Sequence, residues 1–127
     1  MMILDTLDLW RRSEFVWGET DCIMATCNHV WAETEVDPAA PWRGTYHDEA
    51  GARAIYEPFG GVLALFKHGM GQAGFKMTGH LQDGFPVVCD VAGHEVAGIS
   101  LGRRIAFMAQ GRGVVEMRAR VLGAWAL

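Results

Sequence analysis

The spacing of apolar residues changes once along this chain, near residue 85, from a repeat of three to four residues to a repeat of two. The first spacing places apolar side chains on one face of a helix, and the second places them on one face of a strand. Helices followed by strands predict an α+β fold, in which N-terminal helices pack on a small C-terminal antiparallel sheet that curls toward a barrel. The predicted helices cover residues 2–12, a segment from residue 21 to before the Asp37-Pro38 pair, residues 48–56 and residues 62–68. The predicted strands cover residues 85–91, 95–101, 103–109 and 114–118, and residues 124–127 are expected to close the sheet.

Length and composition favour a single domain over residues 1–127. Half of the 127 residues are hydrophobic and 20% are charged, without an internal repeat or a linker, so the chain can bury a core. The formal net charge of −4 argues against nucleic acid as a partner, because phosphate binding needs a concentrated basic surface. The charge is uneven: residues 1–60 hold eleven acidic and four basic residues, whereas residues 86–127 hold three acidic residues and five arginines.

The cysteine count indicates a reducing compartment, and the apolar runs are too short for a membrane span. Three cysteines is an odd number, so a complete disulfide framework is excluded and reduced thiols are expected. No apolar run approaches the roughly 18 residues of a membrane span. Residues 1–10 carry two aspartates and lack the basic start of a signal peptide. We therefore expect a soluble domain with no membrane span.

Cys22 is the candidate nucleophile of this sequence. It follows a glycine break at Gly18 and the polar residues Thr20 and Asp21, which are typical of a helix start. Backbone N–H groups and the helix dipole stabilise a thiolate in the first turn of a helix, and an attacking cysteine needs that form. The alternative is a small buried residue that happens to begin a helix. By the same criteria Cys27 is expected in the core and Cys89 in a strand.

A cysteine nucleophile needs a base, and His94 is the best placed of the five histidines. It stands at the start of a predicted strand, after an Ala92-Gly93 turn, where the alternative is an exposed turn residue. His29 lies on the same predicted helix as Cys22 but about two turns away, which is too far for direct contact. The remaining three, His47, His68 and His80, stand near helix ends or in a loop.

No metal or cofactor site is expected. Cys22, Cys27 and His29 share one helix, but their spacing turns the side chains in different directions. The glycine-rich stretch at residues 69–74 lacks the G-K-[ST] end of a phosphate loop and is interpreted as a mobile connection.

Several motifs resemble known proteins in order and spacing. Phe15-x-Trp17-Gly18-x-x-Asp21-Cys22 resembles the nucleophile motif of NlpC-type cell-wall peptidases, which are papain-like cysteine hydrolases. The segment at residues 96–102 is similar to the peptidase strand that starts with the catalytic histidine. The other motifs together resemble a family of small phage, prophage and gene-transfer-agent proteins of unassigned function. These motifs are Asp37-Pro38-Ala39-Ala40, Arg43-Gly44-x-Tyr46, Gly51-Ala52-Arg53 and Gly60-Gly61.

The resemblance implies an NlpC-type fold whose catalytic residues are mostly lost. It places the peptidase histidine at Val96 and the third polar residue near Phe107, so only Cys22 is kept. It further implies a structural or assembly protein of the distal tail or tail tip, a pseudoenzyme located in the virion tail, and in the host cytoplasm during assembly. The implied partners are hub, distal tail and fibre proteins.

Two alternatives remain at this stage. In the first, the chain is an active cysteine hydrolase that cuts cell-wall peptides during phage entry, with Cys22 attacking and His94 taking the proton. In the second, it is a chaperone or adaptor that helps the tail to assemble and is absent from the finished particle.

Overall fold

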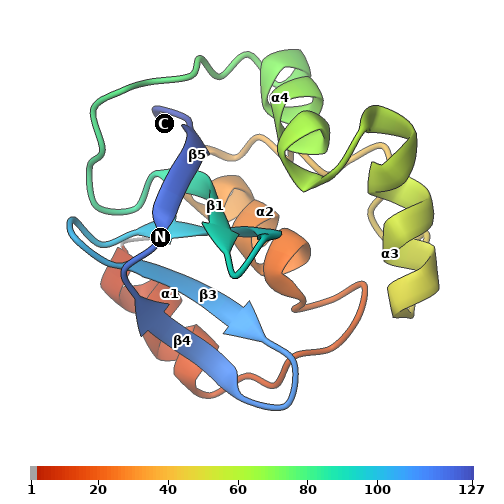
Figure 1. The fold of residues 1–127 in the computed structure, drawn as a ribbon, viewed down its shortest axis with the longest axis horizontal. Helices are drawn as coiled ribbons and strands as arrows, with labels where there is room; N and C mark the ends of the chain where they lie inside the picture. The colour runs from red at the N-terminus through yellow and green to blue at the C-terminus, as the bar shows by residue number, and fades with distance from the viewer. Residues whose placement is uncertain (1–2) are drawn as a thin grey trace.

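The computed structural model describes residues 3–127 and has the α+β architecture predicted from the sequence (Figure 1). Four α-helices and one 3₁₀ turn come first in the described chain, and five strands follow. The helices are α1 (Ile3–Arg11), α2 (Cys22–Thr34), α3 (Glu49–Tyr56) and α4 (Val62–Gln72), with the 3₁₀ turn η1 (Glu57–Phe59) between α3 and α4. The strands are β1 (Pro86–Val91), β2 (His94–Ser100), β3 (Ile105–Ala109), β4 (Gly113–Met117) and β5 (Arg120–Ala124).

The five strands form one antiparallel sheet in the order β4-β3-β2-β1-β5. The first four form the meander that the sequence predicts, and the β1–β2 turn uses Ala92 and Gly93, both with positive φ. The predicted closing strand at residues 124–127 is wrong. The fifth strand comes earlier and pairs with β1. Beyond it, Trp125 forms an isolated bridge to Met77, and its N–H donates to the Pro86 carbonyl.

The sheet has to curl, because β4 and β5 lie at its two edges and only two residues connect them. Met117 and Arg120 are three Cα–Cα steps apart, so they are separated by at most about 11 Å. In a flat sheet, strands at these two edges would be about 19 Å apart. The curl encloses an apolar cluster on the face of the sheet away from α2, formed by Val87, Cys89, Ile105, Phe107 and Ala124.

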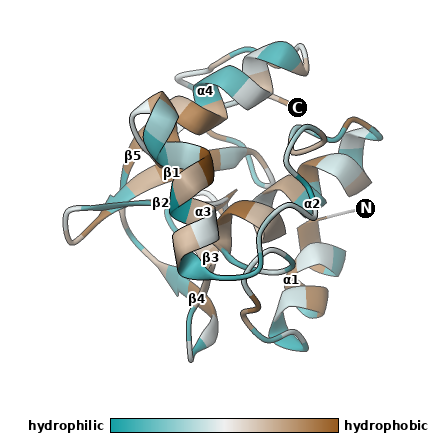
Figure 2. Ribbon diagram, turned by 90° about the vertical axis from the view of Figure 1, so that its right-hand side faces the viewer, coloured by the Kyte–Doolittle hydropathy of each residue, from teal (hydrophilic) through white to brown (hydrophobic). Residues whose placement is uncertain are grey.

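The opposite face of the sheet packs against α2 and α4 and forms the main core. Hydrophobic residues run along α2 in the interior (Figure 2). Cys27 is 2% exposed in this cluster and Cys89 is 1% exposed inside the curl, which confirms both predicted placements. Large members of the main core are Met24, Val30, Leu65, Phe66, Met70 and Trp125.

Helix α4 extends four residues further than predicted. Residues 69–72 continue the helix instead of forming a mobile connection, although each glycine in a helix costs about 1 kcal/mol relative to alanine. The packing of this part of α4 against the rest of the fold offsets that cost. Met70 is fully buried, and a Cβ at Gly69 would lie 3.2 Å from the Pro38 carbonyl oxygen. Glycine therefore lets α4 approach the loop at residues 36–42.

Candidate active site

Cys22 is the first residue of α2, and Asp21 before it caps that helix. Asp21 is 1% exposed, and its Oδ1 accepts a 2.8 Å hydrogen bond from the Met24 N–H. Its Oδ2 accepts two more, from the Gly18 N–H at 2.8 Å and from the Tyr46 hydroxyl at 2.6 Å. A buried carboxylate with three donors fixes the start of α2 and therefore the position of Cys22.

The thiol of Cys22 interacts with strand β2 through the backbone. Burial raises the pKa of Cys22 to about 11, and the charge of Asp21 acts in the same direction. The backbone N–H groups of Ala97, Ile23 and Cys22 itself favour the thiolate but do not offset burial. At pH 7 only about one thiol in ten thousand is then ionised. The cysteine sits where the sequence places it, but the thiol is protonated.

Alkylation of Cys22 in the folded chain is expected to be slow at pH 7. Its rate should rise about tenfold per pH unit up to pH 9, because the thiolate is populated only on approach to the pKa of about 11. The measurement is iodoacetamide labelling followed by mass spectrometry of the peptide that contains Cys22. The same peptide in the urea-unfolded chain is the control, and its rate should level off near the ordinary cysteine pKa of about 8.5. Cys22 is partly buried, so fast labelling of the folded chain at pH 7 would contradict the raised pKa.

The structure does not bring His94 to Cys22. His94 is the exposed first residue of β2 and is paired with Val91 next to the hairpin turn. Ala97, whose backbone contacts the Cys22 sulfur, comes three residues later in the same strand. Side chains three positions apart point to opposite faces of a strand and are about 10 Å apart along it. His94 instead borders a surface hollow of about 410 Å³ together with Tyr56 and Glu95.

None of the histidines within residues 3–127 forms a hydrogen bond with Cys22. His47, His68 and His80 are exposed, as their predicted positions near helix ends and in a loop suggest. The ring of His68 lies 4.8 Å from that of Phe59. His29 is the exception, since it is 2% exposed in the interior. Sequence reasoning missed this buried role.

His29 joins three segments of the fold as a neutral imidazole. Its Nε2 lies 2.8 Å from the Gly84 carbonyl oxygen, and its Nδ1 lies 2.7 Å from the Thr6 hydroxyl. A carbonyl only accepts, so the proton belongs on Nε2, and Nδ1 accepts from Thr6. Burial lowers the pKa of His29 below its ordinary value. Protonation would replace the acceptor at Nδ1 with a second donor in a buried position.

Stability is expected to fall as the pH drops below about 6.5, the ordinary pKa of histidine. The unfolded chain binds a proton at His29 more readily than the folded chain, because the folded pKa is the lower one. The stabilising contribution of His29 is therefore complete above the pKa that this side chain has in the unfolded chain. It is lost as the pH falls from there through the lower pKa of the folded chain. Urea unfolding of the His29→Gln variant should show a smaller difference between pH 7 and pH 5. His80→Gln, at an exposed position, should keep the original difference, and equal pH profiles for the two variants would exclude this role for His29.

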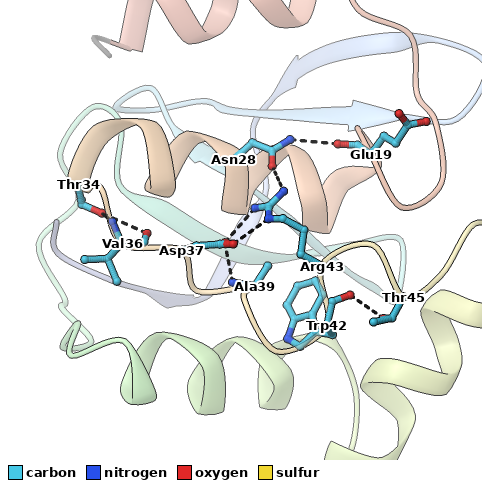
Figure 3. Close-up of polar contacts among 9 residues, drawn as sticks. All are labelled: Glu19, Asn28, Thr34, Val36, Asp37, Ala39, Trp42, Arg43 and Thr45. Carbon is cyan, nitrogen blue, oxygen red and sulfur yellow. Dashed lines mark hydrogen bonds and ion pairs between the residues drawn. The ribbon is translucent and has the colours of Figure 1, made fainter.

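A second polar cluster fixes the loop at residues 36–43 against α2 (Figure 3). The Arg43 guanidinium donates to both carboxylate oxygens of Asp37, at 2.7 and 2.9 Å, and to the Asn28 side-chain oxygen at 2.6 Å. It also lies 4.5 Å from the centre of the Trp31 ring. Burial alone would raise the pKa of Asp37, but the bonds from Arg43 hold it below its usual value. The two motifs that contain Asp37 and Arg43 are visible in the sequence, and opposite charges at the two ends of a Pro-containing turn are the signal that could have paired them.

The described residues offer no site for a metal ion and no membrane-spanning helix. Within residues 3–127, histidine, cysteine, aspartate and glutamate side chains nowhere form a group of three or more that could hold a metal. No helix in this range is long and apolar enough to cross a membrane.

Comparison with protein-family models matches residues 2–127 to DUF6950, a domain of unknown function. Comparisons with curated proteins and with solved structures found no match. The match covers nearly the whole chain, so the contacts around Cys22, Asp21 and Arg43 all lie within the family domain.

Proposed function

We propose that this chain, which belongs to the DUF6950 family, is a non-catalytic structural or assembly component of a phage tail. We further propose that it is built on a degenerate NlpC-type, papain-like peptidase fold. The observation that carries the proposal is the environment of Cys22. A thiol with a pKa of about 11 faces the backbone of Ala97, where a cysteine hydrolase needs a base.

The arrangement of elements supports a papain-like ancestry. In the peptidases that the sequence resembles, the nucleophilic cysteine begins a helix and the histidine comes from a strand beside it. Here Cys22 begins α2, and its sulfur meets β2 of a curled antiparallel sheet. The helix and the strand are both present, so the missing part is the side chain that would activate the thiol.

The side chains at the strand positions near Cys22 support the proposal that catalytic activity has been lost, because none of these side chains is a base. The sequence resemblance places the catalytic histidine at Val96 and the third polar residue near Phe107. Both of these side chains pack in the cluster inside the curl, on the face away from α2. The residue of β2 that belongs to the core around α2 is Ala97. Neither Val96 nor Ala97 can accept a proton, so the choice between them does not change the conclusion.

The missing base and the protonated thiol reduce reactivity together. Loss of general-base assistance costs about 10²–10⁴-fold in rate. The small thiolate fraction at neutral pH adds to that loss, because the thiolate is the attacking form. The geometry therefore supports a packing module better than a hydrolase.

The motifs that resemble phage, prophage and gene-transfer-agent proteins make contacts that hold this fold together, which supports a structural role. Arg43 binds Asp37, and Tyr46 binds Asp21. At Gly61 a Cβ would come within 2.5 Å of a carboxylate oxygen of Glu95. The resemblance to phage, prophage and gene-transfer-agent proteins supplies the tail setting of the proposal. Its partners there are hub, distal tail and fibre proteins, and its locations are the virion tail and, during assembly, the host cytoplasm.

The test uses particles of the phage or prophage that encodes the chain. Mass spectrometry of purified particles is expected to detect its peptides, and a Cys22→Ala mutant is expected to assemble infectious particles in normal yield. Particles without the chain would indicate a transient assembly factor instead of a tail component. Loss of muropeptide cleavage in intact Cys22→Ala particles would establish a hydrolase and overturn the non-catalytic role.

A further inference from the structure

A surface groove of about 270 Å³ is lined by the loop at residues 36–42, by Phe59 and by the second half of α4. Phe59 and Val36 are 44% and 40% exposed at its border, so much of its apolar wall faces solvent. The Phe59 ring stacks against His68 of α4. We call this feature the loop–α4 groove, and its main lining residues are Val36, Pro38, Pro41, Trp42, Phe59 and His68.

Asp37, the one carboxylate among the described residues that line the loop–α4 groove, is paired with Arg43, and two exposed glutamates lie close to the lining along the chain. Glu35 adjoins Val36, Glu57 lies two residues before Phe59, and both side chains are exposed. Neither forms an ion pair with another residue of the described chain. Lys67 on α4 does not neutralise them, because at 100° per residue it points away from the helix face that lines the groove.

An arginine cluster lies at the other end of the molecule. Arg103 and Arg104 are exposed in the turn before β3, and exposed Arg118 follows Met117, which pairs with Ile105 at the start of β3. The three guanidinium groups form no ion pair within residues 3–127. Along the longest axis, the turn before β3 lies at the left-hand end, whereas α3 and the start of α4 lie to the right (Figure 1).

The aromatic rings and nearby carboxylates of the loop–α4 groove suit the guanidinium groups of the arginine cluster. A guanidinium group stacks on aromatic rings while it pairs with carboxylates, and it does both better than a lysine ammonium does. The chain already contains one such arrangement, since Arg43 lies over the Trp31 ring and pairs with Asp37. The loop–α4 groove can offer a similar combination, because Trp42 and Phe59 line it and the exposed carboxylates of Glu35 and Glu57 lie within two residues of its lining.

We propose that copies of this chain associate head to tail, with Arg103 and Arg104 of one copy bound in the loop–α4 groove of the next. Two different surfaces of the chain meet in this contact, so it repeats from copy to copy and builds a ring or an open filament. The surfaces themselves carry the proposal, which holds whether or not the chain belongs to a phage tail.

The first measurement is the oligomeric state of the purified full chain by sedimentation velocity over a range of concentrations. Oligomers are expected at about 0.1 M NaCl, and they should dissociate at about 1 M NaCl, where the screening length falls from about 10 to about 3 Å. A chain that remains monomeric at low salt and high concentration would overturn the proposal.

Charge reversal tests the two surfaces separately. The R103E/R104E variant and the E35K/E57K variant should each be monomeric at low salt, whereas an equimolar mixture should form complexes. The mixture restores association because the unmodified loop–α4 groove of R103E/R104E meets the unmodified arginine cluster of E35K/E57K. R112E, at an exposed arginine of the β3–β4 turn, is the matched control and should associate as the unmodified chain does. Unchanged association of either double variant would show that copies meet through other surfaces, and unchanged melting temperatures would exclude misfolding as a cause of dissociation.

Discussion

Replacement of Gly18 by alanine is expected to lower the free energy of unfolding by about 3 kcal/mol or more. Gly18 has φ +82°, and a Cβ there would stand 2.1 Å from the Tyr46 carbonyl oxygen. The left-handed backbone alone costs an alanine about 1–2 kcal/mol. The overlap adds the remainder, because the chain cannot move away without lengthening the bond from the Gly18 N–H to Asp21.

Gly111→Ala is the matched control for Gly18→Ala. Gly111 has φ +74°, but no atom lies within 4 Å of the Cβ that alanine would add. Gly111→Ala should therefore lower the free energy of unfolding only by the backbone cost of about 1–2 kcal/mol. Urea unfolding of the two variants separates the conformational cost from the steric overlap. Equal losses would show that the chain absorbs the overlap at Gly18, and that the approach of Tyr46 is not fixed.

Elements with strong local signals could be predicted from the sequence. Helix α3 was expected at residues 48–56 and is observed at Glu49–Tyr56, because Asp48 is a good N-cap and accepts the Gly51 N–H. The turn at Ala92-Gly93 likewise follows from Gly93, which adopts positive φ freely, whereas Ala92 takes its φ of +51° at a cost of about 1–2 kcal/mol. Both features depend on neighbours within a few positions. A single sequence read by residue type contains that information.

Elements that depend on distant contacts could not be predicted in this way. Strand β5 has no alternation strong enough to identify it, and it is held by β1, whose paired residues lie thirty or more positions earlier. The end of α4 depends on the fit of Gly69 against Pro38 and on the burial of Met70. Local propensity opposes the helix there, and tertiary packing outweighs it.

For the candidate site, the sequence predicted the position of Cys22 but not its chemistry. The helix start follows from Gly18 and Asp21, which both lie within four residues of Cys22 in the sequence. The pKa of the thiol depends on burial under β2, a contact with Ala97 across seventy-five residues. His94 was assigned from its position at a strand start, and the direction of its side chain depends on a register that the sequence leaves open.

Replacement of Asp21 by alanine is expected to destabilise the chain by about 4 kcal/mol, because up to three buried donors lose their acceptor at a cost of about 1–3 kcal/mol each. These donors are the N–H groups of Gly18 and Met24 and the hydroxyl of Tyr46. Tyr46→Phe removes only the last of these bonds and should cost about 1–2 kcal/mol. The order of the two losses tests whether Asp21 or Tyr46 is the centre of the cluster.

Asp48→Ala is the matched control for Asp21→Ala, because both aspartates cap a helix but only one is buried. Asp48 is exposed and accepts a single bond of 2.7 Å from the Gly51 N–H, so its loss should cost about 1 kcal/mol. Chemical denaturation of both variants measures the difference. Equal losses would mean that water replaces the carboxylate of Asp21, and that the start of α2 is open to solvent. A loss several times larger at Asp21 would mean that the buried carboxylate next to the candidate nucleophile holds the start of α2 in place through its three hydrogen bonds.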